Sequence, residues 1–187
     1  MRNLIRAMGF IWLSVGWSVC YATSVLVPVN ASWKYYDLPQ PPNEEWVKMD
    51  FDDSGWSSGK GQLGYGEGDE QTILAKEHEG QPVLAHYFRH KFSFVQNLKI
   101  NELKLRLVVD DGVRIYLNGV EVHRRLLAES AKQGGNFALG SLIEHSWYEV
   151  VLDSSITLKR DNIVAVEVRQ VSSNSSDLSF NLELIAE

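Results

Sequence analysis

Two adjacent carboxylates are the first residues in this sequence that could carry out chemistry. Asp110 and Asp111 precede Gly112 at the end of an apolar segment. Calcium takes about six to eight oxygen ligands, and aspartate is a frequent source of them. Aspartate before glycine is also typical of a tight turn, because its side chain hydrogen-bonds to the backbone of the turn. The turn is the favoured interpretation, and Asp110 and Asp111 are the candidate metal ligands.

Aromatic side chains in long loops are the second candidate chemistry, because flat rings stack on the apolar C–H face of a sugar. Residues 52–69 contain six glycines and are expected to form a long, turn-rich loop around Tyr65. Residues 126–142 form a second irregular segment that contains Asn136 and Phe137. Function concentrates in the long loops of compact β domains. We therefore predict that Tyr65 is an exposed sugar-binding platform, with Asn136 and Phe137 as further ligand-binding candidates.

No group of residues has the spacing of a catalytic site. The acidic residues Glu44 and Glu45, and those in residues 67–70, are not separated like a general acid and its base. His86 and His90 are four residues apart, which on a strand separates them by about 13 Å, too far to share a metal ion. No serine, histidine and aspartate combination is recognisable as a nucleophilic triad. The sequence therefore predicts a protein that is not an enzyme.

Alternating apolar and polar residues predict the strands that position these side chains. In residues 103–109, four apolar side chains share one face, with Lys104 and Arg106 opposite. The same alternation recurs in residues 164–168 and 178–184. No convincing helical run is present. The fold class is therefore predicted to be all-β, a jelly-roll β-sandwich of eight or nine antiparallel strands.

Turn residues support antiparallel pairing of these strands. Asn118 and Gly119 separate residues 114–117 from residues 120–124, and both tolerate positive φ, as a type I′ hairpin turn requires. Glu167 is out of phase with the valines of its strand. Its side chain points either into a groove or into solvent, and solvent is the favoured expectation.

The charge of the chain excludes some partners. Residues 1–22 contain two of the 18 basic residues and no acidic ones, which leaves 16 basic and 24 acidic residues, a net charge of −8, in residues 23–187. A nucleic-acid partner would require clustered Lys and Arg, so none is expected. No membrane span is expected after residue 22, because no later segment is long and apolar enough.

The first 22 residues are predicted to be a signal peptide, and residues 23–187 a single β-sandwich domain. Arg2 and Arg6 give a basic start, an apolar stretch of about 11 residues follows, and Ala22 precedes the expected cleavage position. The protein is therefore expected to be secreted or periplasmic. A retained N-terminal membrane anchor is one alternative. Lipid anchoring through Cys20 is another, although the bulky Trp17 fits it poorly; Cys20 is the only cysteine, so no disulfide is expected.

Eight short motifs occur in an order known from other proteins. They are residues 31–37 (ASWKYYD), 51–56 (FDDSGW), 61–66 (GQLGYG), 87–89 (YFR), 110–112 (DDG), 115–119 (IYLNG), 162–168 (NIVAVEV) and 175–180 (SSDLSF). The chain resembles the galactose-binding-domain-like jelly rolls of secreted bacterial proteins, in particular the accessory module found beside calcineurin-type phosphoesterase domains. Its hairpin is also similar to that of the sugar-binding jelly roll of large β-galactosidases.

The resemblance covers residues 33–184 and implies the fold more specifically than the function. Such modules bind carbohydrate, act as calcium-stabilised spacers or pack against a catalytic domain. The family pattern suggests that Trp33, Trp46 and Trp56 pack structurally. The sequence departs from the pattern at Arg169, where a histidine is common, and at residues 125–127. No catalytic domain follows Glu187 in this sequence, so phosphoesterase activity is not expected.

These observations predict an exported, non-catalytic module that binds carbohydrate or another glycan. The alternative is a structural or interaction protein of the bacterial periplasm or cell surface that docks on a partner protein. Calcium is the one candidate cofactor under either interpretation.

Overall fold

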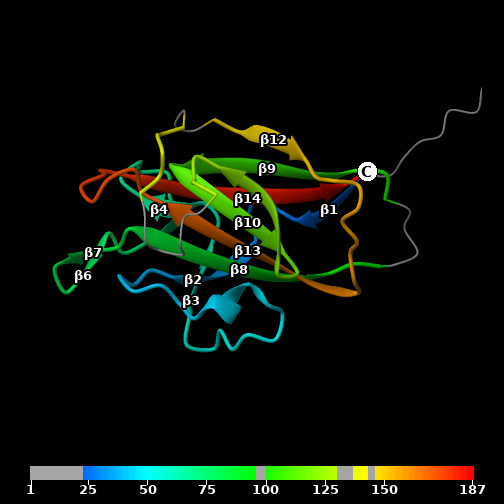
Figure 1. Ribbon diagram of the computed structural model, residues 1–187, viewed down its shortest axis with the longest axis horizontal. Coiled ribbons are helices and arrows are strands. Elements are labelled where there is room, and N and C mark those ends of the chain that lie inside the picture. Colours follow the sequence, from blue (N-terminus) through cyan, green and yellow to red (C-terminus); the bar gives the residue numbers. More distant parts are fainter. Residues whose placement is uncertain (1–22, 96–99, 130–136, 143–145) are drawn as a thin grey trace, which may run out of the picture.

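The computed structural model describes residues 23–95, 100–129, 137–142 and 146–187, which form two large β-sheets stacked face to face and a small two-stranded sheet (Figure 1). The described elements are β1 (Ser24–Val27), β2 (Ser32–Tyr36), the 3-10 helix η1 (Glu44–Val47), β3 (Ser57–Lys60), β4 (Leu63–Tyr65), β5 (Thr72–Ile73), β6 (Glu77–His78), β7 (Gln81–Pro82), β8 (Ala85–Ser93), β9 (Leu103–Asp110), β10 (Gly112–Leu117), β11 (Val120–Arg125), β12 (Tyr148–Val151), β13 (Asp161–Arg169) and β14 (Leu178–Ala186). The predicted all-β sandwich is confirmed. The strands outnumber the predicted eight or nine because several, such as β5, β6 and β7 with two residues each, are too short to show alternation.

The first sheet has the strand order β12-β9-β14-β4-β5, and β1 also pairs with β14. Its centre is the antiparallel β9–β14 pair, in which Leu107 lies opposite Leu182 and Leu105 opposite Leu184. All four leucines are buried, because side chains two residues apart share a face and this face is turned toward the second sheet. The alternation of residues 103–109 and 178–184 therefore predicts this pair correctly.

The second sheet has the strand order β11-β10-β13-β8-β2-β3. Its longest pair is β13–β8, which runs from Asp161 opposite Ser93 to Arg169 opposite Ala85. Val164, Val166 and Val168 of β13 are completely buried between the sheets. The intervening residues of β13 point to the outer face of this sheet.

Aromatic side chains join the two sheets at the centre of the core. The rings of Phe88 (β8) and Phe180 (β14) stack with their centroids 4.1 Å apart. Trp33 of β2 packs edge-on against Phe180 at 5.0 Å. None of the three is exposed to solvent, and complete burial of an apolar side chain contributes about 1.5–3 kcal/mol.

The Asn118-Gly119 turn is fastened to the start of β13. Both residues have positive φ, +54° and +86°, as predicted for this hairpin. The Asn118 side chain accepts a hydrogen bond from the Ile163 backbone N–H at 3.1 Å and donates one to Asn162 Oδ1 at 2.9 Å. The buried Asn162 also bonds both backbone groups of Lys159, at 2.9 and 2.8 Å. The asparagines of the motifs at residues 115–119 and 162–168 therefore hold the hairpin to the sheet.

The outer face of the second sheet is covered by residues 44–56, here called the covering segment. Asn43 begins η1 by accepting a hydrogen bond from the Glu45 backbone N–H. The covering segment places Trp46 and Trp56 in a cluster of buried and partly buried side chains with Tyr36, Val47, Phe51, Ala85, Tyr87, Tyr116 and Ala165. This sheet is therefore packed on both faces.

Arg89 of β8 ties the covering segment to the second sheet. Its Nε donates to Asp53 Oδ2 at 2.7 Å, and its Nη1 donates to the backbone carbonyls of Trp46 and Lys48. Its guanidinium carbon also lies 5.1 Å from the centroid of the Phe51 ring. Arg89 is only 1% exposed, so these contacts are shielded from water.

The outer face of the first sheet carries ion pairs that water reaches. Lys104 Nζ lies 2.7 Å from Glu187 Oε2. Arg106 pairs with Glu183 at 2.6 Å and with Glu149 at 3.2 Å. The polar half of the predicted β9 alternation therefore faces outward on this sheet.

The predictions for residues 1–22, including cleavage after Ala22 and lipid anchoring at Cys20, lie outside the described residues. Within the part of the chain that the structure describes, no helix is long and apolar enough to cross a membrane.

Candidate binding site

Most of the predicted site residues that the structure describes meet at one end of the sandwich, at the left of Figure 1 near β4 and the β13–β14 connection. Tyr65 lies opposite Leu178, and Asp110 lies opposite Ser179, so β14 places both near the same end. Gln170 Nε2 donates hydrogen bonds to the Tyr65 hydroxyl at 2.7 Å and to the Asp177 carbonyl at 3.0 Å. Three segments far apart in the sequence are therefore joined here.

Tyr65 is not an exposed platform, and that prediction is wrong. Its side chain is 8% exposed because it is the last residue of β4 and faces the core, not a loop position. Burial is the main cause that raises the pKa of Tyr65 to about 12. Its hydroxyl is bonded to Gln170, and the His86 ring lies 6.0 Å away, centroid to centroid. Tyr65 therefore closes this end of the core, and stacking of a sugar on it would require the loops to move.

The candidate metal ligands Asp110 and Asp111 are also buried, with 5% and 1% exposure. Asp111 Oδ2 accepts a hydrogen bond of 2.7 Å from the Val171 backbone N–H, which ties the β9–β10 turn to the β13–β14 connection. Among the described residues, no group of three or more His, Cys, Asp or Glu side chains could hold a metal ion. The printed bond of Asp111 is to a distant segment and not to the backbone of its own turn, so Asp111 joins two loops; calcium binding stays a prediction.

Phe137 is the one predicted ligand-binding residue that the structure both describes and exposes, at 44%. The next residue, Ala138, donates its backbone N–H to the Gln170 carbonyl at 2.9 Å. Gly112 permits this approach, because a Cβ there would lie 2.8 Å from the Ala138 Cβ. Phe137 therefore stands on a fixed backbone at the same end of the sandwich. Asn136 lies outside the described residues.

The tryptophans divide into two kinds. Trp33, Trp46 and Trp56 are 0%, 1% and 9% exposed, so their predicted structural role is confirmed. Trp147, directly before β12, is 40% exposed. The guanidinium carbon of Arg106 lies 5.3 Å from the centroid of its ring.

A charged cluster on the second sheet was not anticipated from the sequence. Glu167 is buried, not solvated as expected, and its Oε1 lies 2.8 Å from Arg169 Nε. Arg169 is also completely buried, and Arg114 lies opposite Glu167 on β10. The sequence signal is the i, i+2 spacing of Glu167 and Arg169, which places opposite charges on one face of a strand. Because the side chains of Glu167 and Arg169 are enclosed, they stabilise the fold and are not accessible to a substrate.

The two histidines of β8 show no catalytic pairing. His86 Nε2 lies 2.9 Å from the Ala75 carbonyl, and His90 Nδ1 lies 2.9 Å from the Ser32 carbonyl. A carbonyl only accepts, so each of these nitrogens carries a proton. Burial lowers the pKa of both side chains. Each histidine is therefore a neutral donor to a neighbouring backbone segment.

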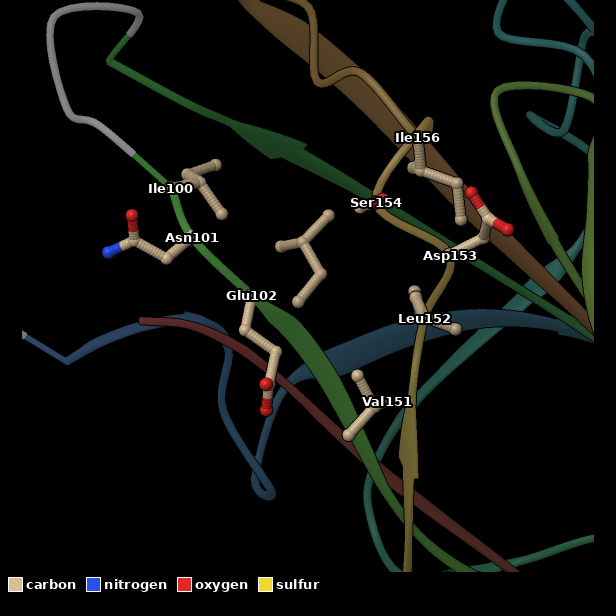
Figure 2. Close-up of a pocket in the computed structure, with 9 residues that line it drawn as sticks. Ile100, Asn101, Glu102, Val151, Leu152, Asp153, Ser154 and Ile156 are labelled. Carbon is tan, nitrogen blue, oxygen red and sulfur yellow. The ribbon is translucent and has the colours of Figure 1, made fainter.

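Figure 2 shows a pocket at the opposite end of the sandwich, between the start of β9 and the chain after β12. Its volume is about 210 Å³, below the roughly 300–1,000 Å³ of ordinary ligand pockets. Glu102 and Asp153 come from opposite walls, and in Figure 2 their carboxylates point away from each other. Glu102 pairs with Lys104 at 3.0 Å, and Asp153 accepts a bond from the Ser155 N–H at 2.8 Å. These carboxylates therefore do not form an acid and base pair.

Comparison with known proteins identifies the fold. No protein-family model and no curated protein sequence matches the chain. Among solved structures, a β-glucuronidase from glycoside hydrolase family 2 has a TM-score of 0.56 and 14% identity over 90% of this chain and 18% of its own. The Bacteroides uniformis β-glucuronidase has a TM-score of 0.54 and 17% identity over 88% of this chain and 18% of its own. An uncultured Clostridium sp. β-glucuronidase has a TM-score of 0.54 and 15% identity over 95% of this chain and 31% of its own.

These similarities establish a β-sandwich of a kind found in glycosidases. At such low identity they show the fold alone. The chain spans 18–31% of the length of these three structures, so the similarity concerns one part of each of those longer proteins. The galactose-binding-like resemblance agrees with this result, whereas the association with calcineurin-type phosphoesterases stays a prediction.

Proposed function

We propose that this protein is an exported, non-catalytic module that binds carbohydrate. The observation that carries the proposal is the similarity of nearly the whole chain to one part of several glycoside hydrolases. A sandwich of this kind can contribute sugar contacts without supplying the catalytic residues.

The chemistry of the described residues supports a non-catalytic role. Four charged residues that are at most 1% exposed, Arg89, Asp111, Glu167 and Arg169, are enclosed by neighbouring structure. His86 and His90 each bond a backbone carbonyl. A hydrolase needs a nucleophile or activated water beside a base, and these contacts occupy the obvious candidates.

Affinity electrophoresis through gels that contain single polysaccharides tests the proposal. Retarded migration in at least one neutral or acidic polysaccharide is expected, with no release of reducing sugar on prolonged incubation. Unchanged migration in every gel would contradict carbohydrate binding, and reducing-sugar release above the rate of a buffer blank would contradict the non-catalytic role.

The proposal does not involve calcium, because in the part of the chain that the structure describes no three His, Cys, Asp or Glu side chains are grouped so that they could hold a metal ion. A bound ion would stabilise only the folded state. We therefore expect the melting temperature to be the same with EDTA as with added calcium. A fall of several degrees in EDTA would restore the calcium hypothesis.

A second candidate function is docking on a partner protein of the bacterial periplasm or cell surface. Two observations favour it: related sandwiches are parts of longer chains, and Phe137 and Leu139 are 44% and 69% exposed at one end of this one. Purification from the native host should then recover a partner at fixed stoichiometry. Replacement Phe137→Asp should abolish that recovery and leave carbohydrate binding unchanged.

A further inference from the structure

Trp147 is the exception among the tryptophans of the described residues. The other three are at most 9% exposed, whereas Trp147 is 40% exposed. A single exposed apolar side chain is normal on a protein surface. Trp147 differs because its ring lies against an arginine that two carboxylates hold in place.

Strand register places Trp147 on the open outer face of the first sheet. Tyr148 of β12 lies opposite Leu107 and packs against the core, and Glu149 lies opposite Arg106. Side chains alternate across a strand, so Trp147 points to the same outer face as Glu149. Continuing the register by one residue places Trp147 beside Val108 of the same outer face. Val108 is only 4% exposed, so the exposed apolar surface at this position is that of the Trp147 ring itself.

Arg106 is fixed over one face of the Trp147 ring, which leaves the opposite face for a sugar. Its guanidinium carbon is 5.3 Å from the ring centroid, Nη1 donates to Glu183 Oε2 at 2.6 Å, and Nε lies 3.2 Å from Glu149 Oε1. The side chains of Arg106 and Glu149 remain 37% and 61% exposed. A ring and planar polar groups, held in place before any ligand arrives, are what sugar recognition uses: C–H groups stack on the ring while hydroxyls bond the polar groups.

We propose that Trp147, with Arg106 and Glu149, binds a neutral pyranose unit of a polysaccharide. This assignment rests on the proposed carbohydrate-binding function and gives it a location. Two carboxylates, from Glu149 and Glu183, surround one guanidinium, so the local charge disfavours a uronate, sulfate or phosphate group. Because the ring lies on a sheet face and not in a pocket, it suits an internal unit of a chain as well as an end.

The test compares Trp147→Ala with Ile73→Ala, which removes an apolar side chain that is 73% exposed on β5, at the opposite edge of the same sheet. The full-length sequence is expressed and the purified proteins are run in affinity gels with neutral polysaccharides, after their melting temperatures are measured. Trp147→Ala should weaken binding by on the order of 10-fold or more, and Ile73→Ala should bind like the wild type. Trp147→Phe, which keeps a smaller ring, should bind more weakly than the wild type and more tightly than Trp147→Ala.

Two further measurements are independent of how the alanine variant folds. Saturating polysaccharide should reduce acrylamide quenching of wild-type tryptophan fluorescence, and Trp147→Phe should lose this ligand effect. Glu149→Gln keeps an oxygen acceptor but removes a negative charge, so it should increase binding of an acidic polysaccharide relative to a neutral one.

The outcomes separate the two proposals. If the wild type binds but Trp147→Ala binds equally well, the site assignment is wrong and the carbohydrate function stands. If the wild type binds only acidic polysaccharides, the neutral ligand class is wrong. If it binds none, both proposals fall.

Discussion

The two outer faces of the sandwich use the same kinds of side chain in opposite surroundings. On the second sheet, Trp46 of the covering segment and Arg89, which lies beneath that segment on β8, are each 1% exposed. On the first sheet, Trp147 is 40% exposed and the Arg106 side chain 37%. Both faces therefore present a tryptophan and an arginine paired with a carboxylate, and they differ mainly in access to water.

This difference separates structural residues from residues available to a ligand. An arginine–carboxylate pair in water contributes about 0–1 kcal/mol, whereas removal of one partner of a buried pair costs about 3–5 kcal/mol. The covered face is thus committed to holding the fold together. The open face retains polar groups and one ring whose replacement the fold should tolerate, which is the condition for a binding surface.

The largest expected effect is from replacing the tryptophan of the covered face. Trp46→Ala removes a ring that packs against Trp56, Tyr87 and Tyr116. The free energy of unfolding should fall by about 3–5 kcal/mol, as is usual when a large buried aromatic side chain is deleted. Urea denaturation measures it, with Trp147→Ala as the matched control, for which a loss of about 1 kcal/mol or less is expected. Equal losses in the two variants would remove the distinction between the faces.

The second effect is from the buried arginine. Arg89→Met keeps much of the side-chain volume but leaves the Asp53 carboxylate and the carbonyls of Trp46 and Lys48 without their donor. A loss of about 3 kcal/mol in unfolding free energy is expected, because Asp53 becomes an uncompensated, mostly buried charge. Asp53→Asn in the same background should recover part of it. An Arg89→Met protein as stable as the wild type would show that the covering segment is held by its aromatic residues alone.

The sequence predicts the interior of the sandwich better than its outer surfaces. Alternation in residues 103–109 and 178–184 identifies the central β9–β14 pair, and Asn118-Gly119 identifies a hairpin turn. Both signals are local, because they depend on the two-residue period of a strand and on positive φ. This is why the fold class and the structural tryptophans were predictable.

The errors concern whether something else covers a side chain. Alternation correctly places Glu167 on the outer face of its sheet, and solvent exposure is the expectation that follows from that placement. Alternation cannot reveal that this outer face is enclosed, since the covering segment is irregular and lies more than 100 residues earlier in the chain. Tyr65 was assigned to a glycine-rich loop because β4, with three residues, is too short to show a period. The exposure of Trp147 likewise depends on tertiary packing.

Acid should destabilise the folded protein through three histidines of the second sheet. Within the described residues, His86 and His90 lie on β8 and His123 on β11, and burial lowers the pKa of all three. The unfolded chain then binds protons at a higher pH than the folded protein does. Stability is therefore fully present above about pH 6.5 and falls as the pH drops below it, by at most about 1.4 kcal/mol per pH unit for each histidine.

The measurement is the unfolding free energy between pH 7.5 and 5.5. His86 is the most informative residue to replace, because it is completely buried and its one protonated nitrogen faces the Ala75 carbonyl. A His86→Gln variant, although less stable at pH 7.5, should show a shallower decline toward pH 5.5. An identical pH dependence in both proteins would assign the decline to other groups.

The smallest expected effect is from the arginine of the open face. Arg106→Met breaks the pairs with Glu149 and Glu183 and leaves the two carboxylates facing each other across β9. Because the Arg106 side chain is 37% exposed, the unfolding free energy should fall by about 0.5–1 kcal/mol in low salt. In 1 M sodium chloride the remaining repulsion is screened, so the difference from the wild type should shrink. The Arg89→Met difference should persist in the same buffer, since its charges are shielded from salt. A large, salt-independent loss for Arg106→Met would mean that the open face also holds the fold together, and Trp147 would then be a structural residue and not a ligand platform.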